Sequence, residues 1–244
     1  MSPSHSSLPS PTADTAGLLR GAKLCLALLL GACASAPPPD WQVHAHSDLQ
    51  AFSQAYLRGN SRVATQAFNR ARNETASTGQ AEQVARVELT RCAVQVASLV
   101  FDDCPGYQAL APDTEPDSRA YAQYLSGRWD GLNVAQLPEQ HRALVQQASR
   151  GQPAPQAGQS ALNTIADPLA QLVAAGTLLR NGRLTPPDIA TATETAAAQG
   201  WRRPLLAWLY VQRQRAGASD GGAPAELARI QRRIDLVLQG GAID

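Results

Sequence analysis

The amino-acid sequence predicts an all-α fold built from antiparallel helical hairpins. Apolar residues recur at spacings of three and four in successive segments, which is the period of an amphipathic helix. No segment sustains the alternation of apolar and polar residues that marks a strand. Two hairpin patterns repeat about 36 residues apart in the C-terminal half, which indicates stacking as an α-solenoid or as a compact helical array.

The first three helices follow from apolar periodicity. One is expected to begin at Ser47, because serine is a good N-cap, and to end at Gly59-Asn60. Its inward face carries Leu49, Phe52, Ala55 and Tyr56. A second spans residues 61–76. A third, over about residues 80–100, is apolar around most of its circumference and is expected to lie buried at the centre.

Part of the first hairpin resembles a tetratricopeptide repeat. The matching positions in the turn and second helix are Gly59, Asn60, Ala64, Phe68 and Ala71. In that family small residues let two helices cross closely and an aromatic residue fills the gap. The first helix lacks the family's Trp, Leu and Gly positions, and Ala76 stands where the closing proline is common. The resemblance covers about 30 residues and implies a helical-hairpin repeat.

The middle of the chain predicts shorter elements. Residues 105–117 read as a loop, and two helices are expected over about residues 117–127 and 138–149. The run Gly-Gln-Pro-Ala-Pro that starts at residue 151 breaks the pattern. It marks a candidate boundary near residues 151–157 inside the helical domain.

The C-terminal helices carry clear start signals. Asp167 and Thr185 are N-caps, and each is followed by a proline at the first helical position. Residues 204–209 echo residues 168–173, and a last helix is expected over residues 224–239. Trp201 and Trp208 flank the start of a helix and are expected to pack the hairpin interface.

The N-terminal segment ends in Leu30-Gly31-Ala32-Cys33, which follows an apolar run over residues 24–30 and the basic residues Arg20 and Lys23. Seven residues are too short to cross a bilayer as a helix, and the pattern is typical of a secretory signal. The tetrapeptide resembles the lipobox of bacterial lipoproteins. That resemblance implies that residues 1–32 are removed and that Cys33 becomes a lipidated, palmitate-bearing N-terminus. The alternatives are an ordinary signal peptide or a buried segment with a chance cysteine.

The residue after the cysteine bears on which membrane would hold the lipoprotein. Ala34 stands where an aspartate favours retention at the inner membrane, so the resemblance implies the inner leaflet of the outer membrane, facing the periplasm. Residues 33–46, with Pro37-Pro38-Pro39, are expected to form a lipid-bearing, Pro-rich tether. The helical domain is then expected over residues 47–244.

The charge balance and the cysteine content restrict the classes of function and the chemistry that the sequence supports. Without Arg20, Lys23 and Asp14, the chain has 19 basic and 19 acidic residues, so its composition does not favour nucleic acid. In an oxidising periplasm, Cys92 and Cys104 are expected to form a disulfide; the alternative is two buried free thiols.

The sequence contains only weak candidates for catalytic or metal-binding residues. Neither a nucleophile elbow nor a phosphate loop nor a zinc spacing is present, so we expect no catalytic residue, metal or cofactor. His44 and His46 are read as solvated tether histidines, His141 as a surface residue and Asp102-Asp103 as loop charge. Three arginines share one face of the last helix and are a candidate partner-binding patch, or else an ordinary solvated face: Arg229, Arg232 and Arg233.

These observations favour an interaction protein. The leading hypothesis is an outer-membrane-anchored periplasmic lipoprotein that acts as a helical-repeat scaffold or adaptor for an envelope protein partner. One alternative is a small-ligand-binding lipoprotein, which requires an apolar pocket with convergent polar groups. The other is a cell-wall-active enzyme, which requires a cleft-facing glutamate; the residues considered for it are Glu74, Glu82, Glu88, Glu139, Glu194 and Glu226.

Overall fold

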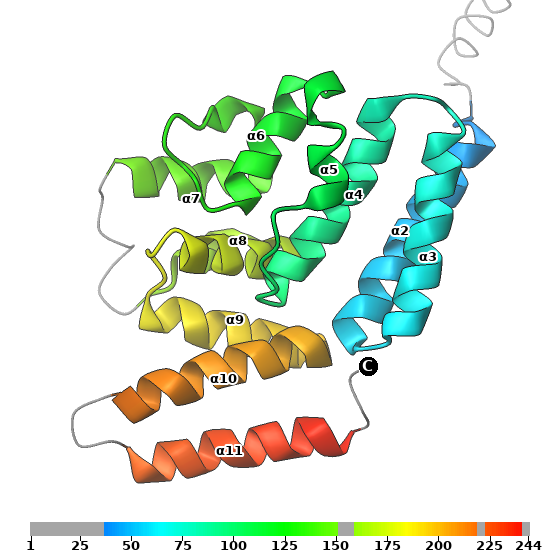
Figure 1. The fold of residues 1–244 in the computed structure, drawn as a ribbon. Helices are drawn as coiled ribbons and strands as arrows, with labels where there is room; N and C mark the ends of the chain where they lie inside the picture. The colour runs from blue at the N-terminus through cyan, green and yellow to red at the C-terminus, as the bar shows by residue number, and fades with distance from the viewer. Residues whose placement is uncertain (1–36, 151–158, 219–222, 241–244) are drawn as a thin grey trace, which may run out of the picture. The chain divides into compact units, whose positions relative to one another are not determined.

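The computed structural model describes residues 37–150, 159–218 and 223–240. In these ranges the chain forms ten α-helices and three short 3-10 helices, with no strand (Figure 1). The predicted all-α class is therefore confirmed for the described residues. The chain divides into two units, Met1–Pro39 and Asp40–Asp244, and the helices belong to the second. Cys33, the predicted signal segment and the candidate boundary at residues 151–157 lie outside the described residues.

The first hairpin consists of α2 (Asp40–Arg58) and α3 (Ser61–Ala76). Gly59, at φ 93°, closes α2, and the amide of Asn60 donates to the carbonyl of Ala55, as in a Schellman cap. The predicted start at Ser47 is wrong. The helix begins at Asp40, whose carboxylate lies in the first turn and suits the positive end of the helix dipole. Ala45 is buried, so residues 40–46 are packed helix and not tether.

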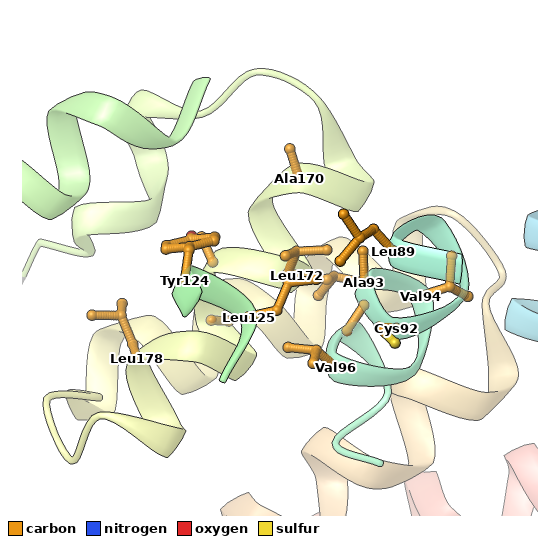
Figure 2. Packing of buried hydrophobic residues seen from close by; sticks show 14 of the residues in the cluster. Leu89, Cys92, Ala93, Val94, Val96, Tyr124, Leu125, Ala170, Leu172 and Leu178 are labelled. Atoms are coloured by element: carbon orange, nitrogen blue, oxygen red, sulfur yellow. The ribbon is translucent and has the colours of Figure 1, made fainter. Parts of the chain in front are cut away.

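Helix α4 (Ala81–Ala97) is the centre of the unit, as its apolar sequence predicts. It packs against α3, α6 and α8. Figure 2 shows side chains of α4 such as Leu89 and Val96 facing Leu125 of α6 and Leu172 of α8. The backbones of α4 and α8 come unusually close at Gly176, where a Cβ atom would lie 2.3 Å from the carbonyl oxygen of Val96.

The middle segment consists of α5 (Pro105–Gln108), α6 (Pro116–Leu125) and α7 (Glu139–Ser149). Short 3-10 helices lie at Ala111–Asp113, Val134–Gln136 and Ala161–Thr164. A disulfide joins Cys92 of α4 to Cys104, which immediately precedes α5. The predicted pairing is thus confirmed, and it fixes the loop after α4 to the helix before it.

The last four helices stack in order (Figure 1): α8 (Pro168–Arg180), α9 (Pro186–Ala198), α10 (Arg202–Ala218) and α11 (Pro224–Gln239). Leu172 of α8 and Trp208 of α10, which stand 36 residues apart at corresponding positions of the sequence echo, are both fully buried. The Asp167 and Thr185 caps also form as predicted: Asp167 accepts from the amide of Ala170, and Thr185 forms a capping box with Asp188.

Helix α10 also contacts α2, so the stack meets the first hairpin. The guanidinium of Arg203 lies 4.4 Å from the ring centroid of Tyr56 and donates to the Tyr56 carbonyl. Trp201 and Trp208 are both buried. The indole N–H of Trp208 reaches the carbonyl of Ala97, so this residue packs against α4 as well as against its own hairpin. No described helix is both long and apolar enough to span a membrane.

Candidate functional site

Two neighbouring pockets flank α4 and share Thr90 in their walls. One, of about 600 Å³, lies between α4, α6 and α7; the other, of about 610 Å³, lies between α2, α8 and the start of α10. We call the two together the α4 groove. Its apolar walls include Leu89, Tyr121 and Leu137 on one side of Thr90, and Leu49, Leu169 and Trp201 on the other.

A polar network holds α6 against α4 at one wall of the groove. The carboxylate of Glu82 accepts from the Ser118 hydroxyl at 2.7 Å and from the Glu115 amide at 2.8 Å. Arg86 donates to the same carboxylate at 2.7 Å and lies 3.6 Å from Asp117. Burial opposes ionisation of Glu82, but these hydrogen bonds outweigh it and lower the pKa of the carboxyl. The acidic cluster is therefore occupied by Arg86 and anchors the wall.

An aromatic cluster packs around Tyr121, which lines the groove. The rings of Tyr121 and Tyr124 are stacked at 6.1 Å, and Trp129 stacks on Tyr124 at 5.7 Å. The Nδ1 atom of His141 lies 3.1 Å from the Tyr124 hydroxyl oxygen. The prediction that His141 is exposed is wrong: it is 1% exposed, because α7 turns this position toward α6. Burial lowers the pKa of His141 to about 4 and raises those of both tyrosines.

His141 should make the fold sensitive to acid. The unfolded chain takes up a proton near pH 6.5, whereas the folded protein does so only near pH 4. The unfolded state therefore binds more protons in this window, and stability falls as pH falls from 6.5 to about 4, by about 3 kcal/mol. Urea unfolding of the parent and of His141→Gln across this range measures the difference. An unchanged pH slope in the variant would show that the imidazole is not the titrating group.

Arg142 is a charged residue of the groove that forms no ion pair among the described residues. Its Nε–H donates to the carbonyl of Leu137 at 2.7 Å, which fixes the guanidinium at the rim. Among the described residues no carboxylate forms an ion pair with Arg142, in contrast to Arg86. The remaining N–H groups suit the carboxylate of a bound partner.

The other histidine candidates lie on α2. His46 lines the groove, and its Nε2 lies 3.0 Å from the side-chain nitrogen of Gln50. His44 faces Glu74 at 4.0 Å. The two histidines were expected in the tether, but both belong to α2, where residues two apart point about 200° from each other. Asp102 and Asp103 lie together in the loop after α4.

The candidate arginine patch lies on α11 and is partly neutralised. Arg229 pairs with Glu226 at 2.7 Å, and Arg233 pairs with Glu194 of α9 at 2.8 Å. Arg232 is exposed. Two of the three arginines thus serve contacts within the protein.

Glu88 is the buried member of the six glutamates considered for catalysis, at 3% exposed. Its two oxygens accept from Arg72 at 2.9 Å and from Arg91 at 3.1 Å. A Cβ atom on Gly106 would lie 2.2 Å from the carboxylate, so the backbone of α5 covers it closely. This arrangement fits a structural ion pair, because a catalytic acid needs access to substrate.

Sequence reasoning missed the groove. Helical periodicity identifies side chains that face the core, whereas Thr90, Tyr121 and Arg142 line a space between helices that are distant in the sequence.

A scan against protein-family models and searches of curated proteins and of solved structures found no match to this chain.

Proposed function

We propose that the protein is an outer-membrane lipoprotein whose helical domain holds a segment of an envelope protein partner in the α4 groove. The observation that carries the binding role is the pair of pockets that meet at Thr90, with apolar walls on both sides and Arg142 at the rim. The lipobox-like sequence that ends in Cys33 supports the proposed membrane anchor. The protein acts as a scaffold or adaptor, facing the periplasm.

The size and chemistry of the groove favour a polypeptide segment. Each pocket is within the range that holds a small ligand, and two neighbours accept successive side chains of one chain. Apolar anchors beside a charged rim are the usual composition of a peptide-binding groove. We infer a segment with two apolar anchors and an acidic residue opposite Arg142.

The scaffold is inferred to be a degenerate array of tetratricopeptide-like hairpins. Its units are α2–α3, α8–α9 and α10–α11, each an antiparallel pair of consecutive helices. The contact of α10 with α2 favours a compact array over an open superhelix. In such an array, α4 supplies the floor that both pockets share.

Site-specific photo-crosslinking in living cells tests the binding role. A photoreactive residue at Gln54 or Gln136, which line the two pockets, should capture one discrete partner. The same residue at Arg62, exposed on α3 outside the groove, is the control. Arg142→Glu should weaken capture from both groove positions. Equal capture from all three positions, or none from the groove, would contradict the proposal.

The anchor is tested in the same cells. Cys33→Ser should release the domain from membranes while leaving it folded, because the lipid is the proposed membrane contact. Cell fractionation followed by immunoblotting measures this. Membrane association that persists in the variant would show that the anchor is wrong, without bearing on the groove.

A further inference from the structure

A third pocket, of about 510 Å³, is lined by the disulfide loop, α6 and the end of α8, and it contains charges of both signs. Three arginines and three aspartates line it: Arg119, Arg128, Arg180, Asp102, Asp103 and Asp130. Within residues 37–150, 159–218 and 223–240, none of the six forms an ion pair. We call this cavity the charged pocket.

Each of the three guanidiniums is positioned by a contact within the protein. Arg180 donates to the carbonyl of Leu125 at 3.1 Å and lies 5.1 Å from the ring centroid of Phe101. Arg119 donates to the carbonyl of Thr114, and Arg128 to the Ser126 hydroxyl at 3.1 Å. Each contact uses part of the guanidinium and leaves other N–H groups for a ligand.

Two of the three aspartates, Asp102 and Asp103, lie in the loop closed by the disulfide, and Asp130 follows α6. The amide of Cys104 donates to the carboxylate of Asp102 at 2.9 Å, and Cys104 is bonded to Cys92 of α4. Next to Arg180 and Arg128, the side chain of Asn181 donates to the carbonyl of Gly127 at 2.8 Å, which brings the ends of α6 and α8 together. The disulfide loop and the ends of α6 and α8, which carry these charges, are therefore tied together.

We propose that the charged pocket binds a small zwitterion of dipeptide size, with its carboxylate on the arginines and its ammonium group on the aspartates. The balance of charges disfavours a simple anion, because the aspartates would repel it. A ligand that carries both signs satisfies both sets at once with charge-assisted hydrogen bonds. The apolar part of the ligand lies against Tyr107 and Ala122, which also line the pocket.

Isothermal titration of the purified full-length chain with alanyl-alanine tests this proposal. N-acetyl-alanyl-alanine and alanyl-alanine amide each lack one charge and should bind about tenfold or more weakly. The double variants Arg119→Gln/Arg128→Gln and Asp103→Asn/Asp130→Asn should each weaken alanyl-alanine by a similar factor. Arg232→Gln, which changes an exposed arginine on α11, should not alter binding.

Two outcomes would overturn the proposal. One is the absence of alanyl-alanine binding at millimolar concentration in a chain whose circular dichroism shows it folded. The other is equal binding of the dipeptide and its two blocked forms, since that would mean that the charges are not read. Neither outcome bears on capture of a partner in the α4 groove.

Discussion

Replacement of Trp208 by alanine is expected to lower the free energy of unfolding by about 4 kcal/mol. The side chain is fully buried and is the largest of the fully buried side chains in the described part of the protein. It fills the space between α10 and α4, and its indole N–H donates to the carbonyl of Ala97 at 3.3 Å. Alanine would leave a large cavity at a junction of helices that are distant in the sequence, and would leave that carbonyl without this partner.

Trp208→Phe is the matched control, because it keeps most of the ring volume and removes the hydrogen bond. It should cost about 1–2 kcal/mol. Chemical denaturation of both variants, followed by far-UV circular dichroism, measures the two effects. A cost for Trp208→Ala as small as that for Trp208→Phe would mean that the surrounding helices collapse into the space, and that α10 is not held against α4 as described.

Gly176→Ala is expected to destabilise the fold by about 3 kcal/mol. The added Cβ atom would lie 2.3 Å from the Val96 carbonyl oxygen and 2.8 Å from the Val96 Cγ1 atom. The first of these atoms is backbone, so α4 and α8 would have to move apart along their length. That movement would also disturb the floor of the α4 groove, because α4 contributes to both of its pockets.

Gly217→Ala, also in a helix, is expected to change the stability in the opposite direction. Gly217 lies within α10, and a Cβ atom there would meet nothing within 4 Å. Alanine has a higher helix propensity than glycine, so this variant should gain up to about 1 kcal/mol. Thermal unfolding of the two variants side by side gives the comparison. Similar behaviour of the two would show that helix propensity, and not the close approach of α4 and α8, sets the effect at Gly176.

The helix boundaries show how far local signals reach. The prolines and caps at Asp167 and Thr185 predict the starts of α8 and α9 correctly, because these signals act within one turn. Ser47 misleads for the same reason: it is a good cap by type, but it lies inside a longer helix whose burial of Ala45 extends α2 to Asp40. Tertiary packing overrides a local capping preference where the burial of side chains stabilises a longer helix.

The candidate site could not be predicted in the same way. His141 has the sequence context of a surface residue, yet it lies beneath the groove against Tyr124. In the sequence nothing distinguishes Glu88 from the other charged residues of α4. In the structure it is buried and forms ion pairs with Arg72 and Arg91. Such environments depend on which helices meet, and helical period carries no information about the identity of the neighbouring helix.

The sequence by itself predicted the helical class and the pairing of Cys92 with Cys104, and the structure confirms both for the described residues. Both predictions rest on periodicity, caps and the chemistry of paired thiols, which are properties of short stretches. The resemblance of Leu30-Gly31-Ala32-Cys33 to a lipobox stays a prediction. Only the tertiary structure decided that α10 returns to α2, that two pockets meet at Thr90, and that six unpaired charges share one cavity. These features join residues far apart in the chain, and their geometry is set by side-chain packing between helices.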